Sequence, residues 1–277
     1  MRKVTIRAEY AGTINTGNYE NERPCYSVEE TIEANLSLSE IEERRFQLDL
    51  ICKRGYDHHV KRIGLELYKK ANPNFRYYDY YGSPYPSVTS ILNYGKTFSV
   101  SNHDLQLYAA RGTLIHKQVE FYIEQGEWIE LDQLDSAKAE YKLVTETKKE
   151  DGELIPLDNY NFRGFEEKYE MDFWKCETTV FNHEHCYAGT QDIKGEHEGK
   201  VTLFDIKTSG AIGQESKEQF FMQLAAYAKC EGNEDVEQLM VIHLNRNNKC
   251  GYANPIITDE IDYYFKLFLK KKKRGNK

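Results

Sequence analysis

Long apolar runs are missing from this 277-residue sequence. No stretch of about 18 consecutive hydrophobic residues occurs, so no membrane-spanning helix is expected. The opening segment, Met1–Arg7, leads directly into alternating polar and apolar residues, with neither the apolar core of a signal peptide nor an Arg- and Ser-rich presequence. We therefore expect a cytoplasmic protein that is not secreted and has no membrane partner.

The sequence also lacks a disulfide framework and an excess of positive charge. The six cysteines lack the spacing of a disulfide framework, which favours reduced thiols. The 37 Lys and Arg residues face 45 Asp and Glu residues, and the net charge of −8 argues against a purely electrostatic nucleic-acid binder. Residues 120–170 hold 15 acids and 6 bases, a net of −9, so the rest of the chain is about neutral and an enzyme acting on nucleic acid stays compatible. Aromatic residues, at 13%, indicate a folded chain.

The first third of the sequence predicts strands followed by helix. Residues 3–33 alternate polar and apolar residues as strands do. Ser39-Glu40-Ile41-Glu42 has the form of a capping box, which predicts helix to about Cys52 and more helix to about Lys70. A Tyr- and Pro-rich connector at 77–85 then separates an N-terminal β/α accessory region, residues 1–76, from a second domain, residues 85–277.

The second domain has the pattern of an α/β core. A single apolar face predicts a helix over 113–123, and the acidic stretch 126–172 is weakly periodic, which is typical of an irregular insertion. After it we expect strands at Cys176–Phe181, Tyr187–Ile193 and Lys200–Lys207, a helix at Gln214–Cys230, a strand at Leu239–Leu244 and a final helix from Thr258 or Asp259. This order, αβββαβ, predicts a sheet flanked by helices.

Reactive side chains are concentrated on two of these strands. Side chains alternate along a strand, so Asp205 and Lys207 emerge on one face while Phe204 and Ile206 point the other way. Asp192 lies 13 positions before Asp205, a spacing that lets an antiparallel hairpin bring the two carboxylates together. Carboxylates hold a hard cation, and a nearby lysine can orient water or balance developing charge, as metal-assisted phosphodiester hydrolysis requires. A surface ion pair is the simpler interpretation of Asp205 and Lys207 alone.

Two helices add polar residues to this set. Gly112-Thr113-Leu114-Ile115-His116 places a histidine in the first turn of the earlier helix, with Glu120 one turn later. Gln223 and Tyr227 share one face of the helix that follows Lys207. Taken alone, His116 would be interpreted as a hydrogen-bonded core histidine. The other polar motifs nearby favour a functional site instead.

Together these motifs resemble the PD-(D/E)XK nuclease superfamily, specifically its RecB-like and phage-type exonuclease branch. That branch shows a Gly-Thr-x-x-His helix, a Gly-Thr-x-Asp strand, an Asp-x-Lys strand and a Gln-x-x-x-Tyr helix in this order. The matching segments here are Gly112–His116, Gly189–Asp192, Asp205–Lys207 and Gln223–Tyr227. Pro86–Leu92 is similar to the lead-in of relatives of the mitochondrial genome maintenance exonuclease. The resemblance covers about residues 85–245.

The resemblance implies a restriction-endonuclease-like fold with a mixed central sheet, and a metal-dependent deoxyribonuclease. It favours an exonuclease of DNA recombination, repair or replication that acts on single-stranded DNA or free ends, in a bacterial or phage-infected cell with replication or recombination proteins as partners. The implied cofactor is Mg²⁺ or Mn²⁺, with two ions expected. Some members carry an iron–sulfur cluster, but Cys230 and Cys250 are too far apart and lack a third partner, so none is expected.

Carried over by position, the resemblance also implies residue roles. Lys207 would be the catalytic amine, and Asp192 and Asp205 the catalytic metal carboxylates. His116 and the backbone carbonyl of Ile206 would complete the metal shell. Glu177 is a candidate accessory metal ligand; its alternative role is an acid that faces solvent. Glu120 is a candidate that would contact the metal ligands rather than the metal itself. The supporting or DNA-contacting residues would be Gln223, Tyr227, Thr208, Lys270, Lys271, Lys272, Lys273 and Arg274; the last five also fit a solvated helix end.

The alternative function is a non-catalytic nucleic-acid-binding module, stabilised by zinc. Cys176, His183, His185 and Cys186 are zinc-type ligands in the form C-x6-H-x-H-C. This spacing is not a common finger pattern. The presence of both aspartates and Lys207 argues against a module without catalysis.

Overall fold

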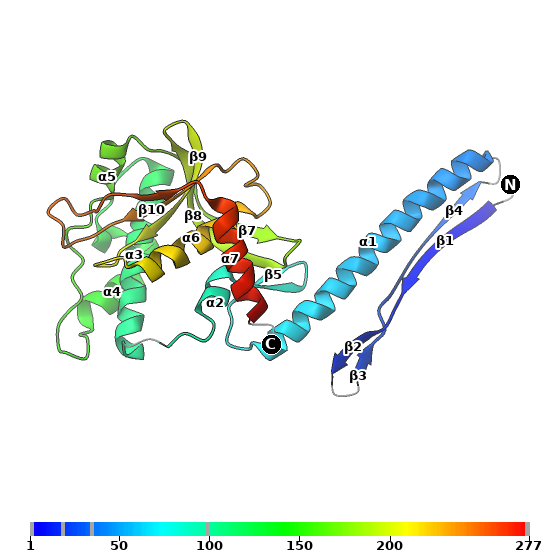
Figure 1. Ribbon diagram of the computed structural model, residues 1–277, viewed down its shortest axis with the longest axis horizontal. Helices are drawn as coiled ribbons and strands as arrows, with labels where there is room; N and C mark the ends of the chain where they lie inside the picture. The colour runs from blue at the N-terminus through cyan, green and yellow to red at the C-terminus, as the bar shows by residue number, and fades with distance from the viewer. Residues whose placement is uncertain (1–2, 18–19, 34–35, 98–99, 275–277) are drawn as a thin grey trace. The chain divides into compact units, whose positions relative to one another are not determined.

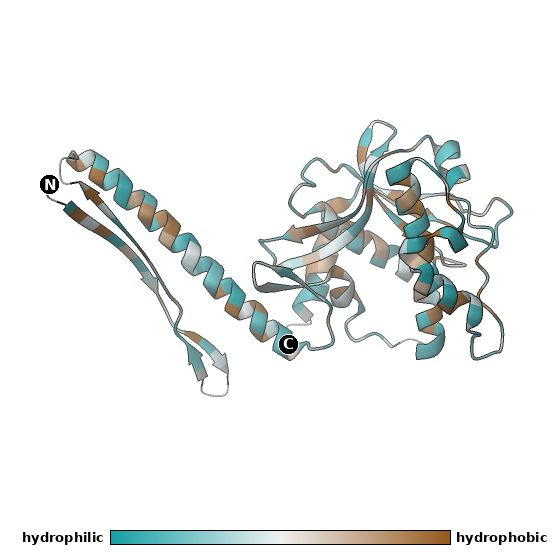
Figure 2. Cartoon of the chain, turned by 180° about the vertical axis from the view of Figure 1, so that it is seen from behind, coloured by the Kyte–Doolittle hydropathy of each residue, from teal (hydrophilic) through white to brown (hydrophobic). Residues whose placement is uncertain are grey.

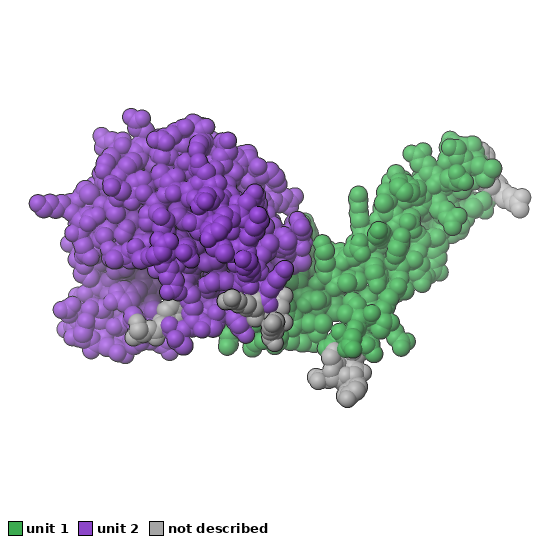
Figure 3. Space-filling model, in the orientation of Figure 1, with its two compact units in different colours: residues 1–85 green, residues 86–277 purple. Residues whose placement is uncertain are grey.

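A five-stranded mixed sheet forms the centre of the larger of two structural units in the computed structural model of the chain (Figure 1). The structure describes all residues except 1–2, 18–19, 34–35, 98–99 and 275–277. Unit 1 spans Met1–Tyr85 and unit 2 spans Pro86–Lys277 (Figure 3). We expected the division within the connector 77–85, and it lies at the end of that segment.

Unit 1 is a long helix packed on an antiparallel pair of strands. Its elements are β1 (Lys3–Ala11), β2 (Ile14–Gly17), β3 (Glu20–Glu22), β4 (Cys25–Glu33), α1 (Leu38–Ala71), β5 (Tyr77–Tyr80) and β6 (Ser83–Pro86), the last crossing the boundary. Strands β1 and β4 pair, and Leu48 of α1 packs on Ile6 and Ile32 of these strands. Hydrophobic residues recur among hydrophilic ones along α1 (Figure 2). Strands β5 and β6 form a hairpin where we expected only a connector.

The start of α1 corrects the predicted capping box. The N-cap is Ser37 rather than Ser39, because the Glu40 N–H donates to Ser37 Oγ at 3.3 Å and the Ser37 N–H donates to Glu40 Oε2 at 2.8 Å. From there the two predicted helical stretches form one continuous helix of 34 residues.

Unit 2 arranges its strands in the order β11-β10-β9-β8-β7. Strands β9 and β10 are parallel, and the other neighbours are antiparallel. The parallel pair is joined by α6, as a crossover connection requires. The strands are β7 (Asp172–Asn182), β8 (Tyr187–His197), β9 (Lys200–Lys207), β10 (Gln238–His243) and β11 (Ile256–Thr258); the helices are α2 (Val88–Asn93), α3 (Asn102–Gln125), α4 (Lys138–Glu146), α5 (Phe162–Tyr169), α6 (Gln214–Ala228) and α7 (Ile261–Arg274).

The two faces of strand β9 are covered by different helices. Phe204 and Ile206 lie in a buried cluster with Ile115 and Val119 of α3. Asp205, on the opposite face, accepts a hydrogen bond from Gln223 of α6. The chain is therefore a mixed α/β protein whose sheet is flanked by helices, as predicted.

Two predicted segments of unit 2 were wrong in extent or character. Helix α3 begins at Asn102 with Ser101 as its N-cap, so His116 lies in mid-helix rather than in the first turn. Gly112 had suggested a helix start, yet the apolar face continues before it through Leu107 and Ala110, which are both buried. The stretch 126–172 is not irregular throughout, since it forms α4, α5 and the 3₁₀ turns Leu131–Gln133 and Asp135–Ala137, and Phe162 and Phe165 enter the core.

Among the described helices, none combines the length and the apolar character that crossing a bilayer would take.

Candidate metal centre

Strands β8 and β9 stop pairing beside the residues that the sequence singled out. Their last backbone pair is Ile193 with Phe204, which places Asp192 and Asp205 across from each other one step further. There the Asp192 carboxylate replaces a strand neighbour, because its Oδ2 accepts the Ile206 N–H at 2.8 Å. The register of the hairpin therefore places the two aspartates at opposite positions, as their 13-residue spacing predicted, although the Asp192 carboxylate turns to the Ile206 backbone.

His116 reaches the same point from α3. Its Nε2 lies 3.0 Å from the carbonyl oxygen of Ile206. A carbonyl can only accept, so Nε2 carries the proton in the neutral ring and Nδ1 keeps a lone pair. The Ile206 carbonyl, predicted as a metal ligand, has this histidine as a partner and retains one further lone pair.

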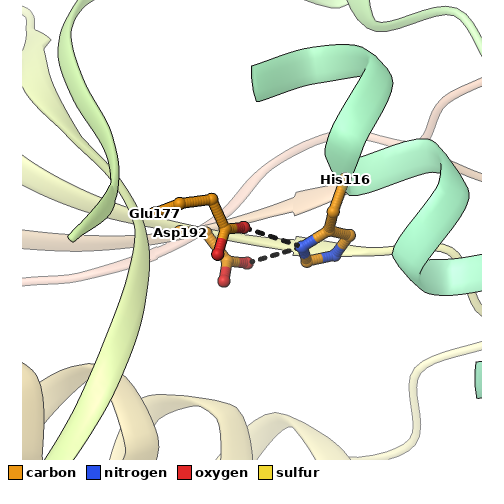
Figure 4. Close-up of side chains that lie close together, drawn as sticks. All are labelled: His116, Glu177 and Asp192. Atoms are coloured by element: carbon orange, nitrogen blue, oxygen red, sulfur yellow. Dashed lines mark ion pairs between the residues drawn. The ribbon is translucent and has the colours of Figure 1, made fainter. Parts of the chain in front are cut away.

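The lone pair of His116 faces two carboxylates (Figure 4). Nδ1 lies 3.6 Å from Asp192 Oδ2 and 3.8 Å from Glu177 Oε1. Burial lowers the pKa of His116, but the charge of Asp192 and the contact with Glu177 raise this pKa by more, so the net shift is upward. In the described part of the chain, His116, Glu177 and Asp192 form the one group of three or more His, Cys, Asp and Glu residues whose ligand atoms all lie within 4.8 Å of one another.

Glu177 is held in this group by an unusual backbone conformation. Its neighbours Cys176 and Thr178 pair with Ile193 and Gln191, so Glu177 lies across from Asp192 inside β7. Its φ is 45°, in the left-handed region that a bulky L-residue rarely adopts. Strain of this kind persists where the surroundings enforce it, often at functional sites.

Asp205 and Lys207 form an ion pair next to this group. Lys207 Nζ donates to Asp205 Oδ1 at 2.7 Å, and Gln223 Nε2 donates to the same oxygen at 3.0 Å. Asp205 is only 1% exposed, and burial raises its pKa to about 6, a shift that the charge of Lys207 opposes. Burial lowers the pKa of Lys207, but the charges of Asp205 and Asp192 raise it by more, so this amine stays protonated at neutral pH.

Gln223 is fixed in turn by Tyr227, and Tyr227 by a glycine. Gln223 Nε2 lies 3.4 Å from the Tyr227 hydroxyl. The Tyr227 ring packs so closely on β8 that a Cβ at Gly189 would lie 2.3 Å from its Cε1. The glycine of the Gly-Thr-x-Asp motif is therefore required by this close approach.

The group fits a hard divalent cation. Separations of 3.6 and 3.8 Å are too long for hydrogen bonds, yet two ligands of one octahedral ion with bonds of about 2.1 Å lie roughly 3 to 4 Å apart. Asp205 Oδ2 is buried and lies 2.6 Å from Lys207 Nζ, so it is ion-paired with this ammonium. A carboxylate oxygen has more than one lone pair, so Oδ2 can still offer one to a further ligand.

The remaining predicted residues lie outside this group. Glu120 is bonded to Lys117 of its own helix, and the carbonyl of Thr208 accepts a hydrogen bond from Arg111 at 3.1 Å. Lys270–Lys273 lie near the end of α7, where burial lowers the pKa of Lys272, and the side chain of Arg274 falls outside the described residues. Sequence reasoning overlooked Arg111, although it directly precedes the Gly112 motif.

The four zinc-type residues do not converge. Cys176 lies in β7 and contacts Glu124, whereas His183 and His185, beyond the end of that strand, contact Glu231 and Glu184. The six residue steps from Cys176 to the strand end at Asn182 extend for roughly 20 Å at about 3.3 Å each, which is too far for Cys176 to share an ion with the two histidines.

Comparisons with known proteins add no family. No family model and no curated protein matches the sequence. Among solved structures, the crystal structure of SSO0001 is similar at 13% sequence identity, over 63% of this chain and 87% of that chain, with a TM-score of 0.27. A TM-score of this size carries no argument about fold or chemistry.

Proposed function

We propose that the protein is a metal-dependent deoxyribonuclease of the PD-(D/E)XK superfamily, in its RecB-like exonuclease branch. One observation carries this proposal: the ligand atoms of His116, Glu177 and Asp192 converge beside the ion pair of Asp205 and Lys207. The order αβββαβ, with α6 crossing between the parallel strands β9 and β10, supports a restriction-endonuclease-like core.

His116, Glu177 and Asp192 would hold a Mg²⁺ or Mn²⁺ ion, and Asp205 Oδ2 offers a ligand for a second. When bound, the metal polarises a phosphate and lowers the pKa of a water. Oxygen ligands with one imidazole suit Mg²⁺ or Mn²⁺ better than a redox metal. The Ile206 peptide orients the set, since its N–H fixes Asp192 and its C=O fixes His116.

Lys207 acts as a cation rather than as a base. Its amine remains protonated because two carboxylates face it. The Lys207 Nζ lies 4.9 Å from the centre of the Phe220 ring, and this cation–π contact restricts the side-chain conformations of the lysine. A fixed positive charge at this place stabilises the negative charge that develops on phosphate oxygens and can hold the attacking water by a hydrogen bond.

Through the family resemblance, we also propose that the protein is an exonuclease acting on DNA with free ends. It would work in the cytoplasm of a bacterial or phage-infected cell, together with replication or recombination proteins. End-labelled linear DNA and closed circular DNA, single- and double-stranded, would be incubated with Mg²⁺, Mn²⁺ or EDTA. We expect linear DNA to be degraded from its ends, circular DNA to persist, EDTA to abolish cleavage and Mn²⁺ to restore it. Full cleavage in EDTA contradicts the metal centre, and metal-independent binding without cleavage favours a non-catalytic module.

A further inference from the structure

A second polar cluster lies beyond the C-terminal end of β9, among residues that the candidate metal centre does not use. It consists of Arg111, Tyr160, Ser209 and Arg246. Each of these residues has a buried side-chain nitrogen or oxygen atom that makes no hydrogen bond to the described residues: Arg111 Nε, Tyr160 Oη, Ser209 Oγ and Arg246 Nε. Buried polar atoms are nearly always paired, so four in one region indicate a missing partner.

Contacts between separate segments bring the four residues together. Arg111 donates to the carbonyl of Thr208 at 3.1 Å, next to Ser209, and its guanidinium lies 5.8 Å from the centre of the Tyr160 ring. Asn159 Nδ2 donates to the backbone carbonyl of Arg246, which ties the residue before Tyr160 to the second arginine. Burial raises the pKa of Tyr160 and the charges of both arginines oppose that shift, as expected of guanidinium groups near this hydroxyl.

The backbone carbonyls of this region already have side-chain partners. Three successive carbonyls follow Lys207, and each accepts from a different side chain: Thr208 O from Arg111, Ser209 O from His243 Nε2 at 2.7 Å, and Gly210 O from Asn245 Nδ2 at 2.6 Å. The loop is thereby fixed, and the groups left over are N–H and O–H donors.

The four residues also carry positive charge that is not fully neutralised. Asp158 Oδ1 lies 3.5 Å from Arg246, but this aspartate is 79% exposed, so the pair is weak. Arg111 donates to a neutral carbonyl. Both guanidinium groups are reachable, because Arg246 is 31% exposed and Arg111 is half-buried.

We infer that Arg111, Tyr160, Ser209 and Arg246 bind a phosphate group of a nucleic-acid strand. A phosphate supplies negative charge and several acceptor oxygens, and guanidinium groups match its geometry. Ser209 follows Lys207 by two residues, so a strand held here passes beside the candidate metal centre. The identity of the ligand rests on the proposed nuclease function.

Binding is measured in EDTA, so that no cleavage is needed. Fluorescence anisotropy of a short 3′-labelled single-stranded DNA, with or without a 5′-phosphate, is titrated over a salt series with the full chain. Arg246→Gln should weaken binding about tenfold, and the slope of log affinity against log salt should become shallower by about 0.7 for one lost phosphate contact. Arg163→Gln removes the same charge from an exposed residue of α5 and should change affinity less than about twofold.

Two further variants separate binding from folding. Ser209→Ala and Tyr160→Phe delete hydroxyls that make no hydrogen bond, so the melting temperature should stay level or rise while DNA affinity falls. A purely structural role gives the reverse: a lower melting temperature and unchanged affinity. That result, or an equal loss of affinity in Arg163→Gln, overturns the inference.

The outcomes also distinguish this site from the nuclease proposal. If the wild type never cleaves DNA but the variants weaken binding as stated, the phosphate site stands and the nuclease proposal fails. If the wild type cleaves and all variants bind like it, the phosphate site fails alone. An equal loss on both DNAs identifies an internal phosphodiester as the ligand, and a loss only on the phosphorylated DNA identifies a terminal phosphate. If inorganic phosphate binds to these four residues but the variants leave DNA affinity unchanged, the inference is overturned.

Discussion

Asp192 and His116 bind opposite ends of the same residue in β9. Asp192 Oδ2 accepts the Ile206 N–H at 2.8 Å, and His116 Nε2 donates to the Ile206 carbonyl at 3.0 Å. The backbone that carries Asp205 and Lys207 on either side of Ile206 thus positions two candidate ligands that come from α3 and β8. Loss of either contact would therefore alter the positions of the candidate ligands relative to Asp205 and Lys207.

The double role of Asp192 can be separated by two substitutions. Asp192→Asn keeps an oxygen that can accept the Ile206 N–H but removes the charge, so stability should change by less than about 1 kcal/mol while cleavage falls by at least about a hundredfold. Asp192→Ala removes both and should cost a further 1–3 kcal/mol or so, because a buried N–H is left unpaired. Urea unfolding and cleavage rates measure the two effects, and equal stability of Asn and Ala variants would contradict the structural role.

Glu177 should be strained in the folded state. Its φ of 45° favours glycine, so Glu177→Gly should be more stable than Glu177→Ala by about 1 kcal/mol even though both lose the carboxylate. Both should weaken Mn²⁺ binding equally. Calorimetric metal titration alongside thermal unfolding tests this; if the Ala variant proves the more stable, the left-handed conformation at this residue is wrong.

Much of unit 2 could be predicted because its patterns are local. Strand alternation located β9, and the spacing of Asp192 and Asp205 gave the hairpin register. The start of α3 and the helices within 126–172 could not be predicted in this way. Gly112 does not end the helix, because buried residues on both sides of it, such as Ala110 and Leu114, offset the roughly 1 kcal/mol cost of a mid-helix glycine. Phe162 is buried by tertiary contacts that the acidic composition of its own segment does not predict.

The family resemblance placed His116, Asp192 and Asp205, with Glu177 as an accessory, in one candidate metal shell. The structure groups His116, Glu177 and Asp192, whereas Asp205 contacts Lys207 and Gln223. Which carboxylate meets the histidine depends on the conformation of Glu177 and on the divergence of β8 from β9. Neither feature has a sequence signal.

The metal-free protein should be destabilised by Asp205 as the pH rises from about 4 to about 6. Burial raises the pKa of Asp205 from 3.8 to about 6, so the folded state keeps a proton there that the unfolded state has released. Stability falls with rising pH wherever the folded state binds more protons. Subtracting the melting temperatures of Asp205→Asn from those of the wild type, in EDTA across this range, should isolate the slope. A flat difference would mean that Asp205 titrates normally.

Lys207 is the residue on which the proposed function depends most. Lys207→Met removes the ammonium but keeps the apolar stem, and Lys207 is not among the three grouped ligands, so Mn²⁺ affinity should stay within a few-fold of wild type. Cleavage should fall about 10²–10³-fold, the usual cost of losing one group that stabilises transition-state charge. Lys200→Met is the matched control, because Lys200 stands at the other end of β9 in an exposed ion pair with Asp259 and should have almost no effect on the rate. Single-turnover cleavage and a calorimetric Mn²⁺ titration of both variants make the comparison. A Lys207→Met protein that cleaves at the wild-type rate would show that the buried pair only supports the fold, and the nuclease proposal would then lose its catalytic cation.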